Sequence, residues 1–569
     1  MLAKLMRYSL IGVVYTILAL QMPGAGQLLA QETDDSSPAT EPATEEVADA
    51  AALGLDDKID KAFAPIADWW EGFILTPISF GEGDGKMSIP VVLILLVCGA
   101  AFFTIAFGFI NVRLIPFAIQ VVSGKYDQLE KSGEPDVHGE VNTVDGDLVD
   151  TIRDEGESGE VSHFQALATA VSGTVGLGNI SGVAVAVATG GPGATFWMIV
   201  CGFLGMSTKF VECTLGVKYR DVEKDGTVYG GPMYYLTKGI NGLTAAPIGN
   251  ILGIIFAILC VGASLGGGNA FQANQAAAQI QTLFQLDGGA SGAIIGVVMA
   301  ILVAVVIIGG IKRIANVTEK IVPLMAIIYV IAALIIIVFN IQHVPAAFAQ
   351  IFNGAFNPQA GLGGVIGVIM VGFQRAAFSN ESGAGSAAIA HSAVKTKYPA
   401  SEGIVALLEP FIDTVVICTM TALVIVLFNM QGTFDYGDVD GGKVLIDGAR
   451  VGGVDLTSLA FDSVLPNFKY VLTIAIILFA FSTMISWSYY GLQSWKYLFG
   501  RSAGADMAYK IIFCLFIVIG AGATLDAVIK FSDAMILALV FPNMVGLLLL
   551  FPKVRAELNK YLQAIRNGS

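Results

Sequence analysis

Long apolar stretches alternate with short polar connections over most of this chain. A helix that spans a membrane needs about 20 apolar residues. About eleven segments meet this length, at approximately residues 88–110, 164–189, 194–217, 249–271, 292–311, 320–340, 361–392, 404–429, 469–497, 508–528 and 532–552. The pattern predicts an all-α polytopic protein that crosses a membrane many times.

Two of these apolar segments are interrupted near the middle by glycine and polar residues. The interruptions read SGTVGLGNISG at 172–182 and AFSNESGAGS at 377–386. Lipid offers no hydrogen bonds, so irregular backbone at that depth is tolerated only where it is buried in protein or lines a cavity. Interruptions at corresponding places in two halves indicate a secondary transporter with inverted repeats and a substrate site at the midplane.

Lysine and arginine residues are concentrated in alternate connections between the predicted spans. These residues are Lys218, Arg220, Lys224, Lys312, Arg313, Lys395, Lys397, Lys496, Arg501, Lys553, Arg555 and Lys560. Cytoplasmic connections carry an excess of basic residues. These connections and the C-terminus are therefore predicted to be cytoplasmic. Lys443, Arg450, Lys469 and Lys530 fall on the opposite side.

Ten spans remain when the first one, 88–110, is set aside as peripheral, and they divide into two groups of five. The first group then starts from the cytoplasm and the second group starts from outside. Because five is odd, the second group is inverted relative to the first. The sequence predicts one repeat at 163–360, a second at 361–552 and a cytoplasmic tail at 553–569.

The N-terminal part is predicted to lie outside the cytoplasm. Residues 1–30 have the basic, apolar and small-residue regions of a secretory signal that is cleaved, with a retained anchor as the alternative. Residues 31–86 form an acidic tail and then an interfacial helix with two adjacent tryptophans. Section 87–162 combines the extra span with an acidic insert at 126–160, expected to be a solvated cytoplasmic loop, with a regulatory tail as the alternative. The location implied is a bacterial inner membrane.

Composition supports the membrane prediction and narrows the range of possible partners. Hydrophobic residues make up 55% of the chain and charged residues 14%. The net charge of −15 is carried mainly by the stretches 32–60, 126–160 and 432–463, and it argues against a nucleic-acid partner. The six cysteines all lie in apolar segments, where they are interpreted as small hydrophobic residues rather than disulfides or metal ligands.

The first interruption contains Thr174, Gly176, Gly178 and Asn179. Glycine in a helix interior costs about 1 kcal/mol relative to alanine, so clustered glycines favour local unwinding. Unwound backbone offers amides to a carboxylate and carbonyls to a cation. Close packing of helices through small residues is the alternative, but it does not explain Asn179 or Thr174. The string GLGNISG lacks the GxGxxG spacing of a dinucleotide loop.

The second interruption combines polar, charged and aromatic side chains. It contains Phe378, Ser379, Asn380, Glu381 and Gly383, and Arg375 precedes it. Ionisable groups inside a span indicate a functional or gating role. Arg375 and Glu381 do not share a helical face, so a direct pair requires the break or another helix. The alternative is that Glu381 hydrogen-bonds freed backbone and holds the break open.

Two further spans carry polar residues that point to a small-molecule site. The fourth span ends in GGGNAFQANQ. One interpretation is that Gln272 reaches a substrate, and the alternative is that these polar residues form a solvated helix end. The ninth span contains Ser482, Thr483 and Trp487. Hydroxyl oxygens suit a hard cation such as Na⁺, and Trp487 is suited to close over a small substrate. Alternatively, these hydroxyls bond only carbonyls of their own helix.

Several charged residues lie near the predicted cytoplasmic ends of spans. Lys209 with Glu212, and Glu409 with Asp413, have spacings that place each pair on one helical face. They form either an inner gate or ordinary interfacial anchors. His391 ends the seventh span and is expected to be interfacial.

These motifs resemble the alanine or glycine:cation symporter family (sodium:alanine symporters of the amino acid–polyamine–organocation superfamily). The matching strings are FQALATAVSGTVGLGNISGVAVAVATGGPGATFWM, GGGNAFQANQ, FSNESGAGSAAIAH and FSTMISWSYYG. The resemblance extends from about residue 163 to the C-terminus. The chain departs from the family pattern at Ile199, where a second tryptophan is usual, and in its longer acidic insert and N-terminal extension.

The resemblance implies a LeuT-like five-plus-five inverted repeat, with the first and sixth core helices broken and one extra N-terminal span. It implies uptake of alanine and glycine coupled to sodium, or to protons in some members, and no other cofactor. The implied substrate residues are Thr174, Gly176, Gly178, Asn179, Gln272, Phe378, Thr483 and Trp487. The implied sodium site combines Ser482, Thr483 and first-break carbonyls, and Arg375, Ser379, Asn380, Glu381 and Gly383 are assigned to gating or support of the break.

Three other classes of protein remain as alternatives. An ion channel needs a continuous polar pore, whereas the polar residues here cluster at two breaks. A membrane enzyme needs a metal or a nucleophile–base pair, and the four histidines show no ligand spacing. A receptor would use the same pocket without transport.

Overall fold

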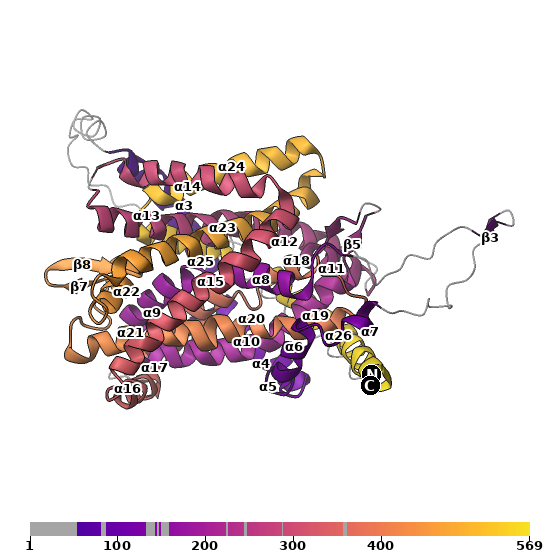
Figure 1. The fold of residues 1–569 in the computed structure, drawn as a ribbon, viewed down its shortest axis with the longest axis horizontal. Helices are drawn as coiled ribbons and strands as arrows, with labels where there is room; N and C mark the ends of the chain where they lie inside the picture. Colours follow the sequence, from indigo (N-terminus) through magenta and orange to yellow (C-terminus); the bar gives the residue numbers. More distant parts are fainter. Residues whose placement is uncertain are drawn as a thin grey trace, which may run out of the picture.

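The structure is a helical bundle whose long helices run along its longest axis (Figure 1). This computed structural model describes residues 54–80, 87–131, 143–144, 147–148, 159–223, 226–243, 247–286, 288–356 and 361–568. The predicted signal and the acidic tail up to residue 53 lie outside the described residues, as does most of the insert at 126–160.

The N-terminal part consists of short elements around one apolar helix. They are α3 (Leu55–Ile74), β1 (Pro77–Phe80), β2 (Met87–Pro90), α4 (Val91–Ala106), α5 (Ile110–Arg113), α6 (Ile115–Val122), α7 (Asp127–Lys131), β3 (Thr143–Val144) and β4 (Asp147–Leu148). The strands pair as antiparallel hairpins, β1 with β2 and β3 with β4.

The middle part contains the first interrupted helix. Its elements are α8 (His163–Thr174), the π-helix η3 (Gly178–Gly182), α9 (Val183–Gly190), α10 (Gly193–Lys218), β5 (Asp221–Val222), β6 (Val228–Tyr229), α11 (Pro232–Tyr235), η4 (Leu236–Ile240), α12 (Ile248–Leu265), η5 (Gly266–Ala270), α13 (Phe271–Phe284), α14 (Ser291–Ile307), α15 (Gly310–Phe339) and α16 (Val344–Phe356).

The C-terminal part contains the second interrupted helix. Its elements are α17 (Gly361–Asn380), α18 (Ala387–His391), α19 (Pro399–Ala406), α20 (Leu408–Pro410), the π-helix η6 (Phe411–Cys418), α21 (Thr419–Phe428), η7 (Asn429–Gln431), β7 (Lys443–Ile446), β8 (Ala449–Gly452), α22 (Gly453–Asp462), α23 (Phe468–Phe499), α24 (Ala503–Gly522), α25 (Leu525–Ala538) and α26 (Val540–Gly568).

Seven helices of the described chain are long and apolar enough to cross a membrane. They are Gly193–Lys218, Ile248–Phe284, Gly310–Phe339, Pro399–Gln431, Phe468–Phe499, Ala503–Gly522 and Leu525–Asn567. The bent pair formed by α8 with η3 and α9 makes an eighth. The predicted spans 88–110 and 292–311 appear as the shorter apolar helices α4 and α14.

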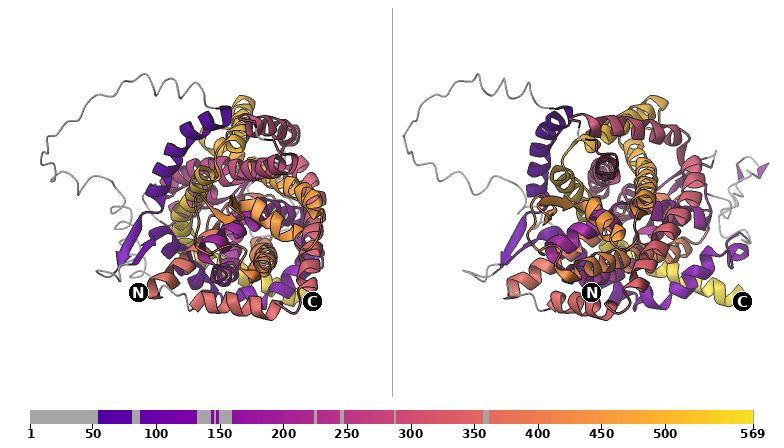
Figure 2. Two further views of the ribbon diagram at one scale, coloured as in Figure 1. Left: turned by 90° about the vertical axis from the view of Figure 1, so that its left-hand side faces the viewer. Right: turned by 60° about the vertical axis from the view of Figure 1, so that its left-hand side comes forward.

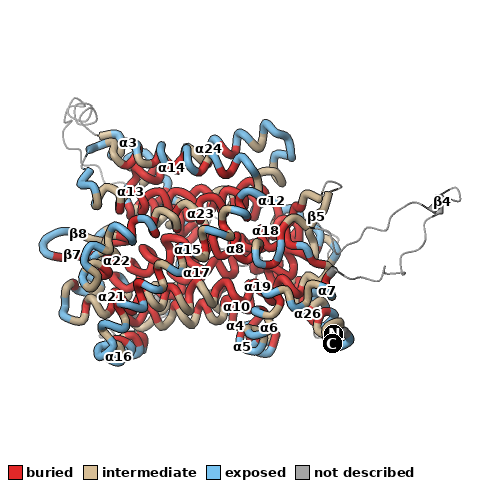
Figure 3. Tube along the Cα trace, in the orientation of Figure 1, coloured by how far each residue is buried: buried red, intermediate tan, exposed pale blue. Residues whose placement is uncertain are grey.

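The surface of the bundle has the apolar character that lipid requires. On α14, Ile294 is 63% exposed and Ile301 61%, and on α15 Val338 is 64% exposed. Burial is concentrated in the central helices, whereas the outer faces of peripheral helices are exposed (Figure 3). Because a water-soluble protein of this kind would present large apolar patches to water, these faces are those of membrane helices.

The two interruptions, residues 172–182 and 377–386, are buried throughout in the bundle that Figure 2 shows from two further sides. Helix α10 packs against α17 and α19, α12 packs against α23, and α14 packs against α24. The predicted interfacial helix is present as α3 and lies against α25, with Phe63 and Phe531 in edge-to-face contact. The interruptions themselves are therefore shielded from the lipid-facing surface of the protein.

The fourth predicted span, 249–271, ends too early. Instead of ending near residue 271, the helix continues through the π-helix η5 to Phe284. Gln272 and Asn274 therefore lie within the helix, with exposed fractions of 3% and 6%. The alternative of a solvated helix end is wrong, because the polar side chains bond to neighbouring helices inside the bundle.

Candidate functional site

The first interruption is present where the sequence predicts it. Helix α8 ends at Thr174, the backbone is non-helical over 175–177, and the axis bends by 49° before α9. The freed amide of Gly176 donates to Asn179 Oδ1 at 2.9 Å, and that of Leu177 donates to Gln272 Oε1 at 2.9 Å. Side-chain oxygens thus replace the missing helical acceptors, as burial of a backbone amide requires.

The second interruption is also present, and its backbone is more sharply turned. Helix α17 ends at Asn380 and α18 begins at Ala387. Glu381, Gly383 and Gly385 have φ angles of 55°, 95° and 82°, all in the left-handed region. Glycine enters this region freely, but a side chain there costs about 1–2 kcal/mol. The carboxylate of Glu212 on α10 accepts the freed amide of Gly383 at 2.8 Å.

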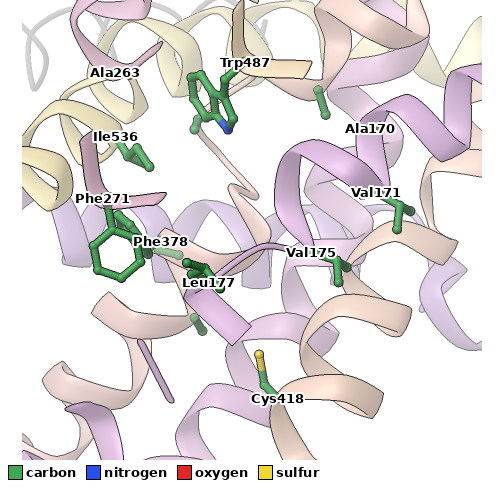
Figure 4. Packing of buried hydrophobic residues seen from close by; sticks show 14 of the residues in the cluster. Ala170, Val171, Val175, Leu177, Ala263, Phe271, Phe378, Cys418, Trp487 and Ile536 are labelled. Carbon is green, nitrogen blue, oxygen red and sulfur yellow. The ribbon is translucent and has the colours of Figure 1, made fainter. Parts of the chain in front are cut away.

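The two interruptions face each other. A Cβ added to Gly178 would lie 3.4 Å from Phe378 Cδ1 and 3.5 Å from the Cα of Ser379. Phe378 packs edge-to-face with Phe271 at 4.9 Å between ring centres, and both rings lie beside Leu177 (Figure 4). The non-helical stretches of α8–α9 and α17–α18 therefore border one shared region of the bundle interior.

Asp413 joins the two interruptions. Asn179 Nδ2 donates to its Oδ1 at 2.6 Å, and Ser379 Oγ donates to its Oδ2 at 2.9 Å. Thr414 also donates to Oδ2, at 2.7 Å, and accepts from Asn380 Nδ2 at 2.9 Å. The sequence placed Asp413 with Glu409 near the inner ends of the spans and did not predict these hydrogen-bond partners. The π-helix η6 changes the angular spacing of residues 411–418, so the α-helical offset does not apply.

Trp487 of α23 closes the shared region from a third direction. Its indole nitrogen donates to Glu381 Oε1 at 3.0 Å and to the carbonyl of Gly173 at 3.3 Å. Glu381 also accepts from Ser386. Trp487 is thus hydrogen-bonded to both interruptions, and it lies across the cluster from Cys418 (Figure 4).

Ser482 and Thr483 connect α23 to the end of α8. Thr483 Oγ1 donates to the carbonyl of Ser172 at 2.9 Å, and Ser172 Oγ donates to the carbonyl of Ser482 at 2.8 Å. Ser482 Oγ donates within its own helix, to the carbonyl of Phe479 at 3.0 Å. Ser482 Oγ also lies 3.4 Å from Met325 Sδ of α15, so the alternative that these hydroxyls bond only carbonyls of their own helix is wrong for both residues. Hydroxyl and carbonyl oxygens are the donor atoms that a hard cation such as Na⁺ takes.

Gly176 shows how closely these elements approach. A Cβ there would lie 2.4 Å from Thr483 Oγ1 and 3.0 Å from Gln272 Oε1, so only glycine fits. Thr174 behaves differently, because its hydroxyl bonds carbonyls of its own helix, Ala170 at 3.3 Å and Val171 at 3.4 Å. The structure thus brings together the predicted substrate residues other than Thr174, whose hydrogen bonds are only local.

Arg375 pairs with a residue that the sequence did not connect to it. Its guanidinium forms an ion pair with Asp533 of α25 and lies 5.7 Å from the ring centre of Phe378. Glu381 and Arg375 are therefore not partners. The Arg375–Asp533 pair covers the aromatic side of the shared region at the end opposite to α18.

The charged residues predicted near the cytoplasmic ends of spans, as an inner gate or as interfacial anchors, are buried. Lys209, Glu212, Glu409 and His391 are each 0% exposed. Lys209 Nζ lies 3.0 Å from Glu409 Oε1, and His391 Nδ1 lies 2.5 Å from Glu402 Oε1. The interfacial placement of His391 is wrong, because the chain folds α18 back beneath the second interruption, where α10 and α8 cover it.

A cavity of about 280 Å³ lies apart from this cluster. It is lined by residues at one end of the bundle, among them Tyr229, Lys312, Tyr489, Lys496 and Lys510. Lys496 and Lys510 both pair with Asp506, at 3.0 Å and 2.6 Å. The lining therefore carries partly neutralised positive charge at the ends of α15, α23 and α24.

Comparison with known proteins identifies the family. The family model for the sodium:alanine symporter family matches residues 143–569. The chain belongs to this family. It is therefore a multi-pass membrane protein of a transporter family, as the sequence predicted.

Individual relatives support the same assignment. The sodium/alanine symporter AgcS of Methanococcus maripaludis is 38% identical over 84% of this chain and 95% of its own length. The putative sodium/proton-dependent alanine carrier protein YrbD of Bacillus subtilis is 36% identical over 73% of this chain and 84% of its own length. Among solved structures, that of MhsT in complex with L-phenylalanine covers 70% of this chain and 99% of its own, with a TM-score of 0.47 and 14% identity.

Proposed function

We propose that this protein imports small neutral amino acids, alanine and glycine, together with sodium, by alternating access. The observation that carries the proposal is the pair of helix interruptions that face each other and share Asp413 and Trp487 as partners. Freed backbone groups at the middle of a membrane protein are the usual means of holding a zwitterion and a cation.

The substrate is held by complementary charges. Its carboxylate binds the amides of Gly176 and Leu177, in place of the oxygens of Asn179 and Gln272 that accept from them here. Its ammonium group lies toward Glu381, a carboxylate that already receives the indole N–H of Trp487. Phe378 and Trp487 limit the side chain to a methyl group or a hydrogen.

The coupling cation is bound between α8 and α23. The carbonyl of Ser172 and the hydroxyls of Ser482 and Thr483 supply oxygen ligands, and the first-break carbonyls complete the set. Coupling follows because the same backbone segment contacts cation and substrate. Proton-coupled transport of the same or other small zwitterions is the second candidate, favoured by the buried carboxylates Asp413 and Glu381.

The proposed arrangement is a LeuT-like five-plus-five inverted repeat in a bacterial inner membrane. The N-terminal end of α8 and the C-terminal ends of α18 and α26 face the cytoplasm, together with the C-terminus of the chain. The ion pair of Arg375 with Asp533 then lies on the outer side of the site. Opening alternates between this side and the side of α8.

The decisive experiment is uptake of labelled alanine and glycine into proteoliposomes, with sodium and proton gradients imposed separately. A sodium gradient is expected to drive accumulation, and accumulation under a proton gradient alone would establish the second candidate. Asn179→Leu removes a side chain that bonds the Gly176 amide and Asp413, the residue that joins the two interruptions, and should abolish uptake, whereas Asn340→Leu, in the turn after α15, should not. Uptake by Asn179→Leu at the native rate would exclude the first interruption from the site.

A further inference from the structure

A chain of buried acids and bases extends from the second interruption toward the end of α8. Glu130, His163, Glu402, His391 and Glu409 follow one another in space, and none is more than 8% exposed. They come from α7, α8, α19, α18 and α20, so each link joins a different pair of elements. Polar and ionisable side chains are costly inside a membrane protein, so a buried chain of them outside the substrate and sodium sites indicates a further function.

The links of this chain are short. Glu130 Oε2 lies 2.7 Å from His163 Nε2, and His163 Nδ1 is bonded to Glu402 Oε2. The other oxygen of Glu402 lies 2.5 Å from His391 Nδ1. His391 Nε2 then faces Glu409 Oε2 at 3.5 Å, beyond a hydrogen bond. Three of the four contacts are therefore hydrogen bonds between an imidazole nitrogen and a carboxylate oxygen.

Counting hydrogens shows that the links around His163 hold one proton more than two neutral imidazoles supply. A nitrogen and an oxygen at hydrogen-bond distance need one hydrogen between them, and an ionised carboxylate supplies none. Three links therefore need three hydrogens, but two neutral imidazoles carry only two. His163 uses both nitrogens in such links, so the third hydrogen lies on its ring or on one of the two carboxyl groups that contact it, Glu130 and Glu402.

The surroundings of His163 favour a positive ring. Glu130 and Glu402 contact it directly, and Tyr561 of α26 donates to the second oxygen of Glu130 at 2.7 Å. On the remaining elements packed around the chain, the nearest titratable groups are Glu319 of α15, which accepts from Gln165, and Lys209 of α10, which pairs with Glu409. The acids outnumber the bases, so the closed arrangement binds a proton that a hydrated imidazole would release.

We propose that His163 is a proton-binding site that fastens α8 to α7 and α19 and that gives up its proton to the cytoplasm when α8 moves away. The proposal rests on the proposed function, because α8 is the half-helix whose movement opens the inner side. It adds a ligand, the proton, to a place outside the substrate and sodium sites.

The direction of the pH effect follows from the proton count. The closed form binds one proton more than the open form, so acid on the inner side favours the closed form. A hydrated imidazole has a pKa of about 6.5, so the effect lies above that pH and amounts to at most about tenfold per pH unit. Uptake should therefore fall as internal pH is lowered from about 8.5 to 6.5 at constant external pH.

Glu130→Gln is the sharpest variant. The amide keeps the shape and donates an N–H to His163 Nε2, so a neutral imidazole completes the link without the extra proton. Uptake by this variant should not depend on internal pH over the same range. His343→Gln is the matched control, because His343 lies in the exposed turn before α16 and should leave the pH dependence intact.

Two measurements separate this proposal from the proposed function. Labelled alanine uptake is recorded in oriented proteoliposomes with internal pH varied. In parallel, pulsed electron paramagnetic resonance records the distance between spin labels at Phe164 of α8 and Lys312 of α15, which needs no transport.

A longer and broader distance at pH 8.5 than at 6.5 in the parent protein, lost in Glu130→Gln, supports the proposal. An unchanged distance in the parent protein, or the same pH response in Glu130→Gln, overturns it. Absence of alanine uptake with a normal distance response would reject the proposed function alone.

Discussion

Trp487 is fixed on several sides by groups that tolerate little change. Its indole nitrogen bonds Glu381 and Gly173, and its ring meets Tyr490 edge-to-face at 5.3 Å between centres. Its Cγ would lie 2.1 Å from a Cβ added to Gly268. A large side chain that bonds both interruptions and leaves no free volume behind it is suited to set the size of a bound molecule.

Gly268→Ala should therefore displace Trp487 and impair alanine uptake severely. A contact of 2.1 Å cannot be relieved without moving the ring, and overpacking a core costs about 1–3 kcal/mol. Gly182→Ala is the matched control, since it also lies in a π-helical segment but has nothing within 4 Å of its added Cβ. Uptake rates and melting temperatures of the two variants provide the measurement. Equal rates would show that Trp487 does not need its present position.

The sequence predicted the residues of the site better than their partners. Asn179, Gln272, Phe378 and Trp487 stood out because polar or bulky side chains interrupt apolar segments, and the structure places all four around the two breaks. Asp413 was placed near the inner end of a span, and its hydrogen bonds to Asn179 and Ser379 were not predicted. Partners on distant helices, such as Asp533 for Arg375, leave no local pattern to be recognised.

At the scale of elements, the two interruptions are built differently. The first is an α-helix that passes through three non-helical residues into a π-helix, with no left-handed residue between 174 and 183. The second has three left-handed residues within five positions. The sequence predicted both interruptions from their glycines, but the π-helices η3, η5 and η6 depend on tertiary contacts and have no such signature. The second interruption is therefore the more rigidly specified of the two.

Gly385→Ala should destabilise the protein measurably. At a φ of 82° a side chain is strained by about 1–2 kcal/mol, and the added Cβ would lie 2.7 Å from Pro232 Cγ. Gly367→Ala on α17 has open space around the added Cβ and should leave stability unchanged or raise it by up to about 1 kcal/mol. Thermal unfolding in detergent compares the two variants. A Gly385→Ala protein as stable as the parent would mean that the turn relaxes without cost.

At the scale of the whole molecule, buried charge lies on both sides of the substrate region. The Arg375–Asp533 pair covers it toward the outer side, and the chain from Glu409 to Glu130 extends beneath it toward the end of α8. Opening either side exposes charges that are paired in this structure. The balance between the two sides is thus set by pairs that can be changed separately.

Asp533→Asn should shift the protein toward the form that is open to the outside. Arg375 is 6% exposed, and loss of the partner of a buried pair costs about 3–5 kcal/mol, which hydration of the guanidinium in an open form relieves. Cys418, beneath the first interruption, reports this opening when it is the only cysteine kept and an impermeant maleimide is added from outside. Its labelling should accelerate by roughly 100-fold, the factor that about 3 kcal/mol produces.

Asp526→Asn is the control on the same helix. Its carboxylate is 48% exposed and paired with Lys530, and surface pairs contribute only about 0–1 kcal/mol. Equal labelling of both variants would mean that the Arg375–Asp533 pair does not hold the outer side closed, and α25 would then be only a structural neighbour of the site.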